Sequence, residues 1–233
     1  MGAAITVLKI KQLEKEKFEQ KKIILKKQSE LGDFEGFENI HIGYPKTIIE
    51  KMYIEKELHY SKVSMNSDTI KEPIYIYWEG MEEPFKEITT GYQKILNFVF
   101  AFNKDYTEIY IFASREVANL FIRRLRREKY ISCDHLKFDF KRISELKNMD
   151  SAWGVWEDYT GIERKRARFG KGINEIIDDK EYESITTIYM DYKYGAEIIQ
   201  LTLNVEGRIS SFSKNISQTD MMVIFEEIRE ILC

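Results

Sequence analysis

An unusual concentration of arginine marks residues 115–127. Five arginines occur in these thirteen positions, although lysine outnumbers arginine by 25 to 11 in the whole chain. On a helical wheel at about 100° per residue, apolar and basic side chains fall on opposite arcs. The apolar arc holds Val117, Ala118, Phe121, Ile122 and Leu125, and the basic arc holds Arg115, Arg123, Arg124, Arg126 and Arg127. Because guanidinium groups make forked contacts with phosphate and carboxylate groups, the pattern predicts a helix that binds nucleic acid or another polyanion.

A second basic cluster lies at residues 163–172, beside one phenylalanine and two glycines. Its cationic residues are Arg164, Lys165, Arg166, Arg168 and Lys171. Trp153 and Trp156 lie a short distance upstream. Cations interleaved with flat aromatic surfaces are typical of proteins that bind single-stranded nucleic acid. We therefore predict that this basic loop and the two tryptophans join the arginine-rich helix in binding, with core packing as the alternative role of the tryptophans.

Carboxylates near a lysine support a different hypothesis, a Mg²⁺-dependent nuclease. In such enzymes acidic residues hold the metal ion while a lysine steadies the attacking water. Asp191 and Lys193, with Asp178 upstream, have the required residue types and are the candidate catalytic residues. The pattern has little specificity, because 32% of the residues are charged. A Mg²⁺ cofactor is expected only under this hypothesis.

Other familiar chemical motifs are missing from the sequence. Gly170 and Gly172 lack the third glycine of a dinucleotide-binding loop, and no phosphate-loop lysine motif occurs. The three histidines have no metal-ligand spacing, and the two cysteines form neither a zinc motif nor a disulfide framework. The favoured function is therefore that of a non-enzymatic binding or regulatory protein, for which we expect no cofactor and no metal site.

Charge is unevenly distributed along the chain. Residues 115–172 carry 15 Lys and Arg against 9 Asp and Glu, a net charge of +6, whereas residues 173–233 carry 5 against 12, a net charge of −7. A basic surface attracts nucleic acid or an acidic protein surface. The alternative function is a protein–protein interaction or assembly module, whose acidic and basic surfaces pair within one monomer, in a homo-oligomer or in a heteromeric complex.

The elements expected to position these residues define an α/β fold, with α+β as the alternative. An imperfect helical spacing predicts an N-terminal helix over residues 5–31. A β-α-β-α-β portion with parallel neighbouring strands follows. Its strands are expected at 73–78, 108–113 and 135–140, and its helices at 84–102 and 115–129. The end of the chain is expected to form a three-stranded antiparallel meander over 185–192, 197–205 and 208–213, with a covering helix that begins after Ser217.

These elements suggest three portions, or one domain that contains all of them. The portions are an N-terminal helix with an irregular region (1–72), the β-α-β-α-β portion (73–143) and the meander with its helix (144–233). No segment approaches the roughly 18 uncharged apolar residues that a membrane-spanning helix needs, and the N-terminus lacks the apolar run of a signal peptide. We expect a soluble cytoplasmic protein without a membrane partner. The lysine-rich composition is typical of an AT-rich bacterium or its phage.

Overall fold

The protein is built mostly from β-strands in the computed structural model, which describes residues 3–19, 22–26, 46–68, 70–76, 86–157, 164–170, 173–174, 185–213 and 215–233. The first strands are β1 (Ala4–Leu13), β2 (Lys22–Lys26), β3 (Lys46–Glu50), β4 (Tyr53–Glu55), β5 (Leu58–Asn66), β6 (Ile70–Ile76), β7 (Lys86–Tyr92), β8 (Ile95–Phe102) and β9 (Glu108–Phe112). The later strands are β10 (Ile131–His135), β11 (Met149–Glu157), β12 (Arg164–Gly170), β13 (Ile173–Asn174), β14 (Thr187–Tyr194), β15 (Glu197–Asn204) and β16 (Arg208–Ser211). The described helices are α1 (Lys15–Phe18), α2 (Arg115–Arg127), the 3-10 helix η1 (Phe140–Glu145) and α4 (Gln218–Leu232).

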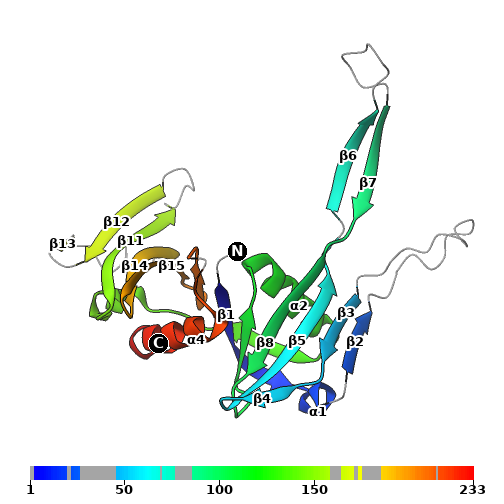
Figure 1. The fold of residues 1–233 in the computed structure, drawn as a ribbon, viewed down its shortest axis with the longest axis horizontal. Coiled ribbons are helices and arrows are strands. Elements are labelled where there is room, and N and C mark those ends of the chain that lie inside the picture. Colours follow the sequence, from blue (N-terminus) through cyan, green and yellow to red (C-terminus); the bar gives the residue numbers. More distant parts are fainter. Residues whose placement is uncertain are drawn as a thin grey trace, which may run out of the picture.

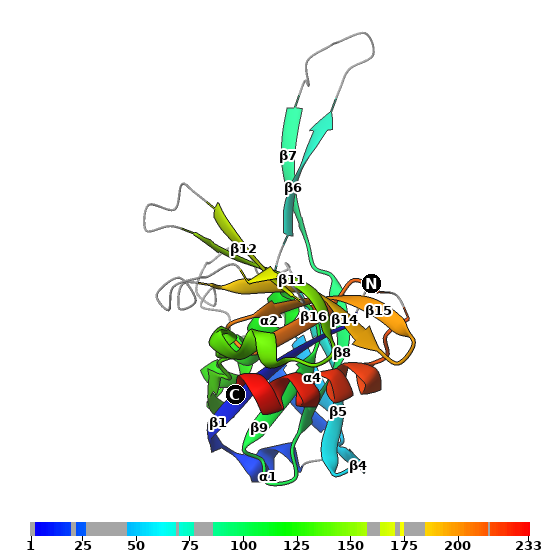
Figure 2. The same cartoon turned by 90° about the vertical axis from the view of Figure 1, so that its left-hand side faces the viewer.

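Fourteen of the described strands form one sheet, and all of their pairings are antiparallel (Figure 1). The sheet runs in the order β13-β12-β11-β14-β15-β16-β1-β9-β8-β5-β3-β2, while β10 pairs with β1 and β4 pairs with β5. Strands β6 and β7 form a separate hairpin that projects from the rest of the molecule (Figures 1 and 2). Because β1 pairs with β16 on one side and β9 on the other, the N-terminal strand joins the two halves of the sheet.

Helices α2 and α4 cover opposite faces of this sheet. On β1, Ile5 and Val7 belong to the hydrophobic cluster that contains the apolar side of α4, whereas Leu8 belongs to the cluster that contains the apolar side of α2. Successive side chains of a strand point to opposite faces, so the two clusters lie on the two sides of β1. Both faces are buried at the centre of the sheet. Towards β14, only the face under α4 is covered by a described helix.

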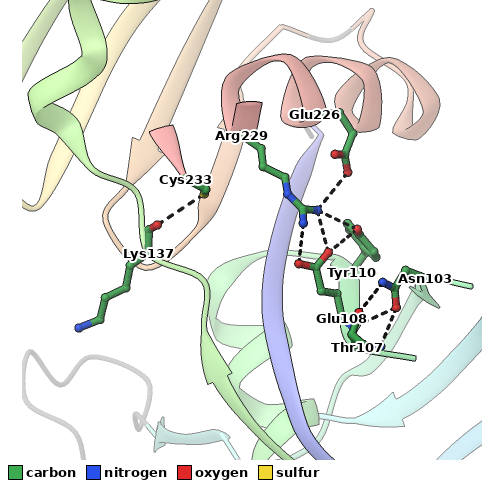
Figure 3. A network of polar contacts seen from close by, with 8 residues as sticks. All are labelled: Asn103, Thr107, Glu108, Tyr110, Lys137, Glu226, Arg229 and Cys233. Carbon is green, nitrogen blue, oxygen red and sulfur yellow. Dashed lines mark hydrogen bonds and ion pairs between the residues drawn. The ribbon is translucent and has the colours of Figure 1, made fainter. Parts of the chain in front are cut away.

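Helix α4 is held to the sheet by polar contacts as well as by its apolar side. Ser217 and Asp220 form a reciprocal capping box at its start. Near its end, the Arg229 guanidinium donates to both carboxylate oxygens of Glu108 on β9, at 2.7 and 2.8 Å (Figure 3). The hydroxyl of Tyr110 donates to the same carboxylate at 2.7 Å. Burial opposes the charge on Arg229, but the Glu108 carboxylate outweighs burial and raises the pKa of the guanidinium.

The predicted N-terminal helix is wrong, because residues 4–13 form β1. The sequence Ile5-Thr6-Val7-Leu8 lacks the polar–apolar alternation of a strand with one solvated face. The structure explains this: all four residues are buried, since both faces are covered at the centre of the sheet. Because polar and apolar residues do not alternate here, the apolar positions further along the segment also match the spacing of a helix. Residues 20, 21 and 27–31 of the predicted helix lie outside the described residues.

The predicted β-α-β-α-β portion is also wrong, so the fold is mostly β and not α/β. The segment predicted to be a helix, 84–102, contains β7 and β8, and β8 pairs antiparallel with β9. Phe98, Phe100 and Phe102 alternate towards the α2 side, but the apolar residues between them also satisfy a helical spacing. Of the strand expected at 135–140, only His135 is in a strand, at the end of β10, and Phe140 begins the 3-10 helix η1. The strand expected at 73–78 overlaps β6, which pairs antiparallel with β7 in the separate hairpin.

Four predicted parts of the chain are confirmed: the helix at 115–129, the strand at 108–113, the antiparallel meander and the C-terminal helix. The helix expected at 115–129 is α2, and the strand expected at 108–113 is β9. The antiparallel meander corresponds to β14, β15 and β16, and α4 begins after Ser217 as expected. These elements share two local signals, capping serines and tight turns. One such turn contains Gly207, whose φ of +70° is a left-handed conformation that favours glycine.

Candidate functional site

The orientation of α2 decides which of its arginines face solvent. The Ser114 hydroxyl accepts from the backbone N–H of Val117 at 3.5 Å and begins the helix. On the buried side, the ring centroid of Phe121 lies 5.1 Å from that of Phe98 and 5.3 Å from that of Phe100. These contacts fix the rotation of α2 on the sheet. The apolar arc predicted from the helical wheel is therefore the arc that meets the sheet.

Two of the predicted binding arginines, Arg123 and Arg127, are exposed on α2. Arg123 Nη2 lies 2.5 Å from a carboxylate oxygen of Asp68, and Arg127 Nε lies 3.3 Å from one of Glu128. Exposed pairs of this kind contribute about 0–1 kcal/mol. Their carboxylates therefore compete only weakly with another anion for the two guanidinium groups.

Arg124 and Arg126 have structural contacts that the helical wheel did not reveal. Arg124 is 5% exposed and its Nη1 donates to Thr47 Oγ1 of β3 at 2.9 Å. Burial lowers the pKa of Arg124, and the charge of Asp68 opposes this shift. Arg126 is exposed, but its Nη2 donates to the carbonyl oxygen of Cys133 at 2.5 Å. A helical wheel predicts one buried arc, the apolar one. Arg124 lies outside that arc but is buried because β3 contacts α2 on this side as well.

Trp153, one of the second predicted group of residues, lies on the face of the sheet opposite α4, whereas Trp156 is three positions along β11 and so belongs to the other face. Ile188, Met190 and Tyr192 of β14 are buried in the α4 cluster, so the alternate residues of β14 lie on the other face. Four residues of this other face are Trp153, Tyr189, Asn204 and Arg208, and we call it the uncovered face. The pairing register continues from Arg208 to Thr6 of β1. The uncovered face is thus continuous with the side of the sheet on which α2 lies.

An aromatic stack stands on the uncovered face. The rings of Trp153 and Tyr189 lie 4.3 Å apart between centroids at an interplanar angle of 15°, and Trp153 is 39% exposed. In the backbone register of β12, Arg168 is opposite Trp153 and Arg166 is opposite Val155. The side chains of Arg164, Lys165, Arg166, Arg168 and Trp156 lie outside the described part of the structure, as does the whole of Lys171. The strand pairing therefore brings the basic cluster to the stack at the level of the backbone.

Arg208 is a cationic residue that the sequence analysis did not single out. Its side chain is partly buried, and its Nε has no hydrogen-bond partner among the described residues. Burial lowers the pKa of Arg208, and the positive charge of Arg115 lowers it further. Arg115 itself lies 3.6 Å from Glu206, which connects the start of α2 to the turn before β16. The sequence analysis considered ion pairs between the basic and acidic segments of one monomer. Among the described residues, Arg115–Glu206 is the ion pair that joins α2 to the acidic C-terminal segment. The only sequence signal for Arg208 was an isolated arginine directly after a Glu-Gly turn.

A cavity of about 270 Å³ lies where α2 meets the sheet. Its described lining residues are Thr6, Leu8, Ala118, Asn119, Ile122, Arg123, Arg126 and His135, and none of these is acidic. Arg123 and Arg126 come from α2, whereas Thr6 and His135 come from the paired strands β1 and β10. Thr6 Oγ1 and His135 Nδ1 are buried and have no hydrogen-bond partner in the described structure.

The candidate nuclease residues do not form a metal site in the part of the chain that is described. Asp191 and Lys193 lie two residues apart on β14, and the Asp191 carboxylate accepts from Ser151 Oγ at 2.8 Å. Asp178 lies outside the described residues. Within the described ranges, no group of three or more His, Cys, Asp and Glu residues could hold a metal ion.

Comparison with protein-family models and with curated proteins finds no match for this chain. None of the described helices is both long enough and apolar enough to span a membrane.

Proposed function

We propose that this protein binds single-stranded nucleic acid, without catalysing a reaction on it, and that the strand lies across the uncovered face. The observation that carries the proposal is the exposed Trp153–Tyr189 stack. An exposed ring on a sheet offers a flat surface on which an unpaired base stacks, and each such contact contributes about 1–3 kcal/mol. Base stacking tolerates any sequence, because every base has two flat faces.

Arginines along this side of the sheet support a polyanionic ligand, although Asp191, two residues from Tyr189 on β14, has its carboxylate on the same face. Arg208 has no ion pair in the described structure, and water covers only part of its side chain. A partly desolvated guanidinium without a carboxylate partner gains most from binding a phosphate. On α2, Arg123 and Arg127 extend the basic surface with pairs that are weak in water. At the other end, the register places Arg166 and Arg168 opposite β11.

The test is to remove the exposed aromatic ring and measure binding of a fluorescently labelled single-stranded oligonucleotide by anisotropy. Trp153→Ala should weaken binding roughly five-fold to a hundred-fold, which corresponds to about 1–3 kcal/mol of stacking. Tyr53→Ala is the matched control, because Tyr53 is 42% exposed and stacks on Tyr60 at 5.7 Å, but lies on β4. We expect the control to bind like the unmodified protein. Equal affinities for Trp153→Ala and Tyr53→Ala, or no binding at low salt, would refute the proposal.

The salt dependence of binding tests the role of Arg208 separately. Each phosphate contact with a single strand adds about 0.7 to the slope of log K against log salt. Arg208→Gln should therefore reduce this slope by about 0.7 while the contribution of the aromatic stack is kept. An unchanged slope would remove Arg208 from the interface.

A second candidate function, protein assembly, is favoured by two exposed apolar residues. Ile198 is 61% exposed and Phe212 is 72% exposed. The proposed binding of single-stranded nucleic acid does not involve these two side chains, whereas a protein partner would bury them. Light scattering separates the two functions. A mass above the monomer that returns to the monomer in Phe212→Ser, without any oligonucleotide binding, would replace the nucleic-acid proposal with assembly.

A further inference from the structure

The cavity between α2 and the β1–β10 pair combines fixed positive charge with buried polar atoms that have no partner. Thr6 is 4% exposed, yet its Oγ1 makes no hydrogen bond in the described structure. On the neighbouring strand β10, His135 Nδ1 is also buried and also lacks a hydrogen-bond partner in the described structure. A buried hydroxyl without a partner costs about 1–3 kcal/mol, so such atoms are uncommon unless a ligand or a water satisfies them.

The wall opposite these two atoms is cationic. Arg126 Nη2 donates to the Cys133 carbonyl, and the other N–H donors of its guanidinium have no hydrogen-bond partner among the described residues. Arg123 is paired only with Asp68, whose side chain is 66% exposed. Since no described lining residue is acidic, the cavity favours an anion and disfavours a metal ion.

The size and the number of polar groups narrow the class of anion. The cavity volume of about 270 Å³ lies just below the range of about 300–1,000 Å³ that is typical for small-molecule pockets. Two guanidinium groups, one hydroxyl and one imidazole can together satisfy the three terminal oxygens of a phosphate monoester. A carboxylate has only two oxygens and would leave part of the wall without a partner.

We propose that this cavity binds a phosphate monoester, held by Arg126 and Arg123 from α2 and by Thr6 and His135 from the sheet. The proposal goes beyond nucleic-acid binding on the uncovered face, which requires no terminal phosphate. Two sources supply the same chemistry: the phosphorylated end of a strand and a free phosphate ester such as a mononucleotide.

Inorganic phosphate is the first probe, titrated by calorimetry and thermal shift at constant ionic strength, with acetate as the comparison anion. Phosphate should bind saturably and raise the melting temperature, and acetate should not. Thr6→Val removes the hydroxyl with little change of shape and should weaken phosphate binding about ten-fold or more, because a hydrogen bond to a charged group contributes about 1.5–3 kcal/mol. Without phosphate this variant should be at least as stable as the unmodified protein, since it removes a buried hydroxyl that has no partner.

Thr202→Val is the matched control for the hydroxyl. Thr202 Oγ1 is also buried without a partner, but Thr202 lies on β15 and does not line the cavity. Arg126→Met and Arg142→Met form a second pair, because Arg142 is an exposed arginine on η1 that does not line the cavity. We expect Thr202→Val and Arg142→Met to bind phosphate normally and Arg126→Met to lose it.

The source of the phosphate is identified by comparing the affinities of three ligands: an oligonucleotide with a 5′-phosphate, the same oligonucleotide without it, and a nucleoside 5′-monophosphate. Tighter binding of the 5′-phosphorylated strand assigns the cavity to strand ends, and preference for the mononucleotide assigns it to a free ester. The proposal is overturned if phosphate and acetate behave alike, or if Thr6→Val and Thr202→Val have the same phosphate affinity. Those outcomes leave the Trp153 experiment unaffected, so the two proposals fail independently.

Discussion

Replacing Glu108 by glutamine should lower the stability of the protein markedly, because it leaves Arg229 without its carboxylate partner. Glu108 is 5% exposed and accepts hydrogen bonds from Arg229 and Tyr110 (Figure 3). Glutamine has nearly the same size but no charge, and its amide group replaces one acceptor with a donor. The guanidinium then keeps its charge in a partly buried place, with only the more distant Glu226 carboxylate, 3.6 Å from Nη1, as an ion-pair partner among the described residues.

The expected magnitude follows from the burial of the two partners. Removing one partner of a buried ion pair costs about 3–5 kcal/mol. The Glu108 side chain is 7% exposed but that of Arg229 is 30% exposed, so water compensates for part of the loss. We therefore expect a loss of about 2–3 kcal/mol. For a chain of this length, that loss lowers the melting temperature by about 4–12 °C.

Glu226→Gln is the matched control for this experiment, because it removes the more distant carboxylate beside Arg229. The Glu226 carboxylate lies 3.6 Å from Arg229 Nη1, and burial raises its pKa, with the charge of Arg229 opposing the shift. Its charged form therefore gains little from folding, and the variant should melt within about 2 °C of the unmodified protein. Calorimetry and urea unfolding measure both losses. The reasoning is wrong if Glu108→Gln also melts within that interval, or if the two variants lose equal stability.

Two further predictions concern a turn and a titrating tyrosine. Gly207→Ala should destabilise by about 3 kcal/mol in urea unfolding, since a Cβ at φ +70° would come within 2.5 Å of the Leu136 carbonyl oxygen. Gly195→Ala, at φ +61° with no atom within 4 Å, should cost only about 1 kcal/mol, and equal losses would contradict the steric argument. Burial and a hydrogen bond to Glu227 raise the pKa of Tyr192 above its ordinary value of 10.0, so its contribution to stability is complete below pH 10.0 and is lost as pH rises above it. Tyr192→Phe should therefore make stability fall less steeply between pH 10 and 11, by up to about 1.4 kcal/mol per pH unit, and an unchanged slope would count against this assignment.

Local signals in the sequence predicted the elements that depend on local physics. Helix α2 begins at a serine cap and has one apolar arc, and α4 begins with a capping box. The meander is bounded by tight turns, and one face of β14 and β15 is solvated enough to preserve alternation. In β1 and β8 both faces contact apolar neighbours, so the alternation disappears and a helical period fits as well. The N-terminal segment was therefore predicted to be a helix, although it forms β1, because both faces of this strand are buried.

The candidate site was predicted in part. Arginine enrichment at 115–127 was found from the sequence, because it is a local feature of composition. Trp153 was also a candidate, but the sequence left binding and core packing open, and its 39% exposure comes from the structure. The burial of Arg124 depends on Thr47 of β3, a strand that lies 77 residues away in the chain. The unpaired atoms of Thr6, His135 and Arg208 share a side of the sheet only because β1 pairs with both β10 and β16. Pairings between distant strands cannot be recognised from the residue type at a single position.

By itself, the sequence determined which residues could carry chemistry here: a helix rich in arginine, aromatic residues near a basic cluster that was predicted to be a loop and forms strand β12, and a meander ending in a capped helix. The tertiary structure alone decided where those residues lie. It placed α4 on one face of a long antiparallel sheet and α2 on the other, and it placed Trp153 and Arg208 where no described helix covers the sheet. The physical reason is that hydrogen bonding between distant strands sets the register, and the register decides which side chains share a face.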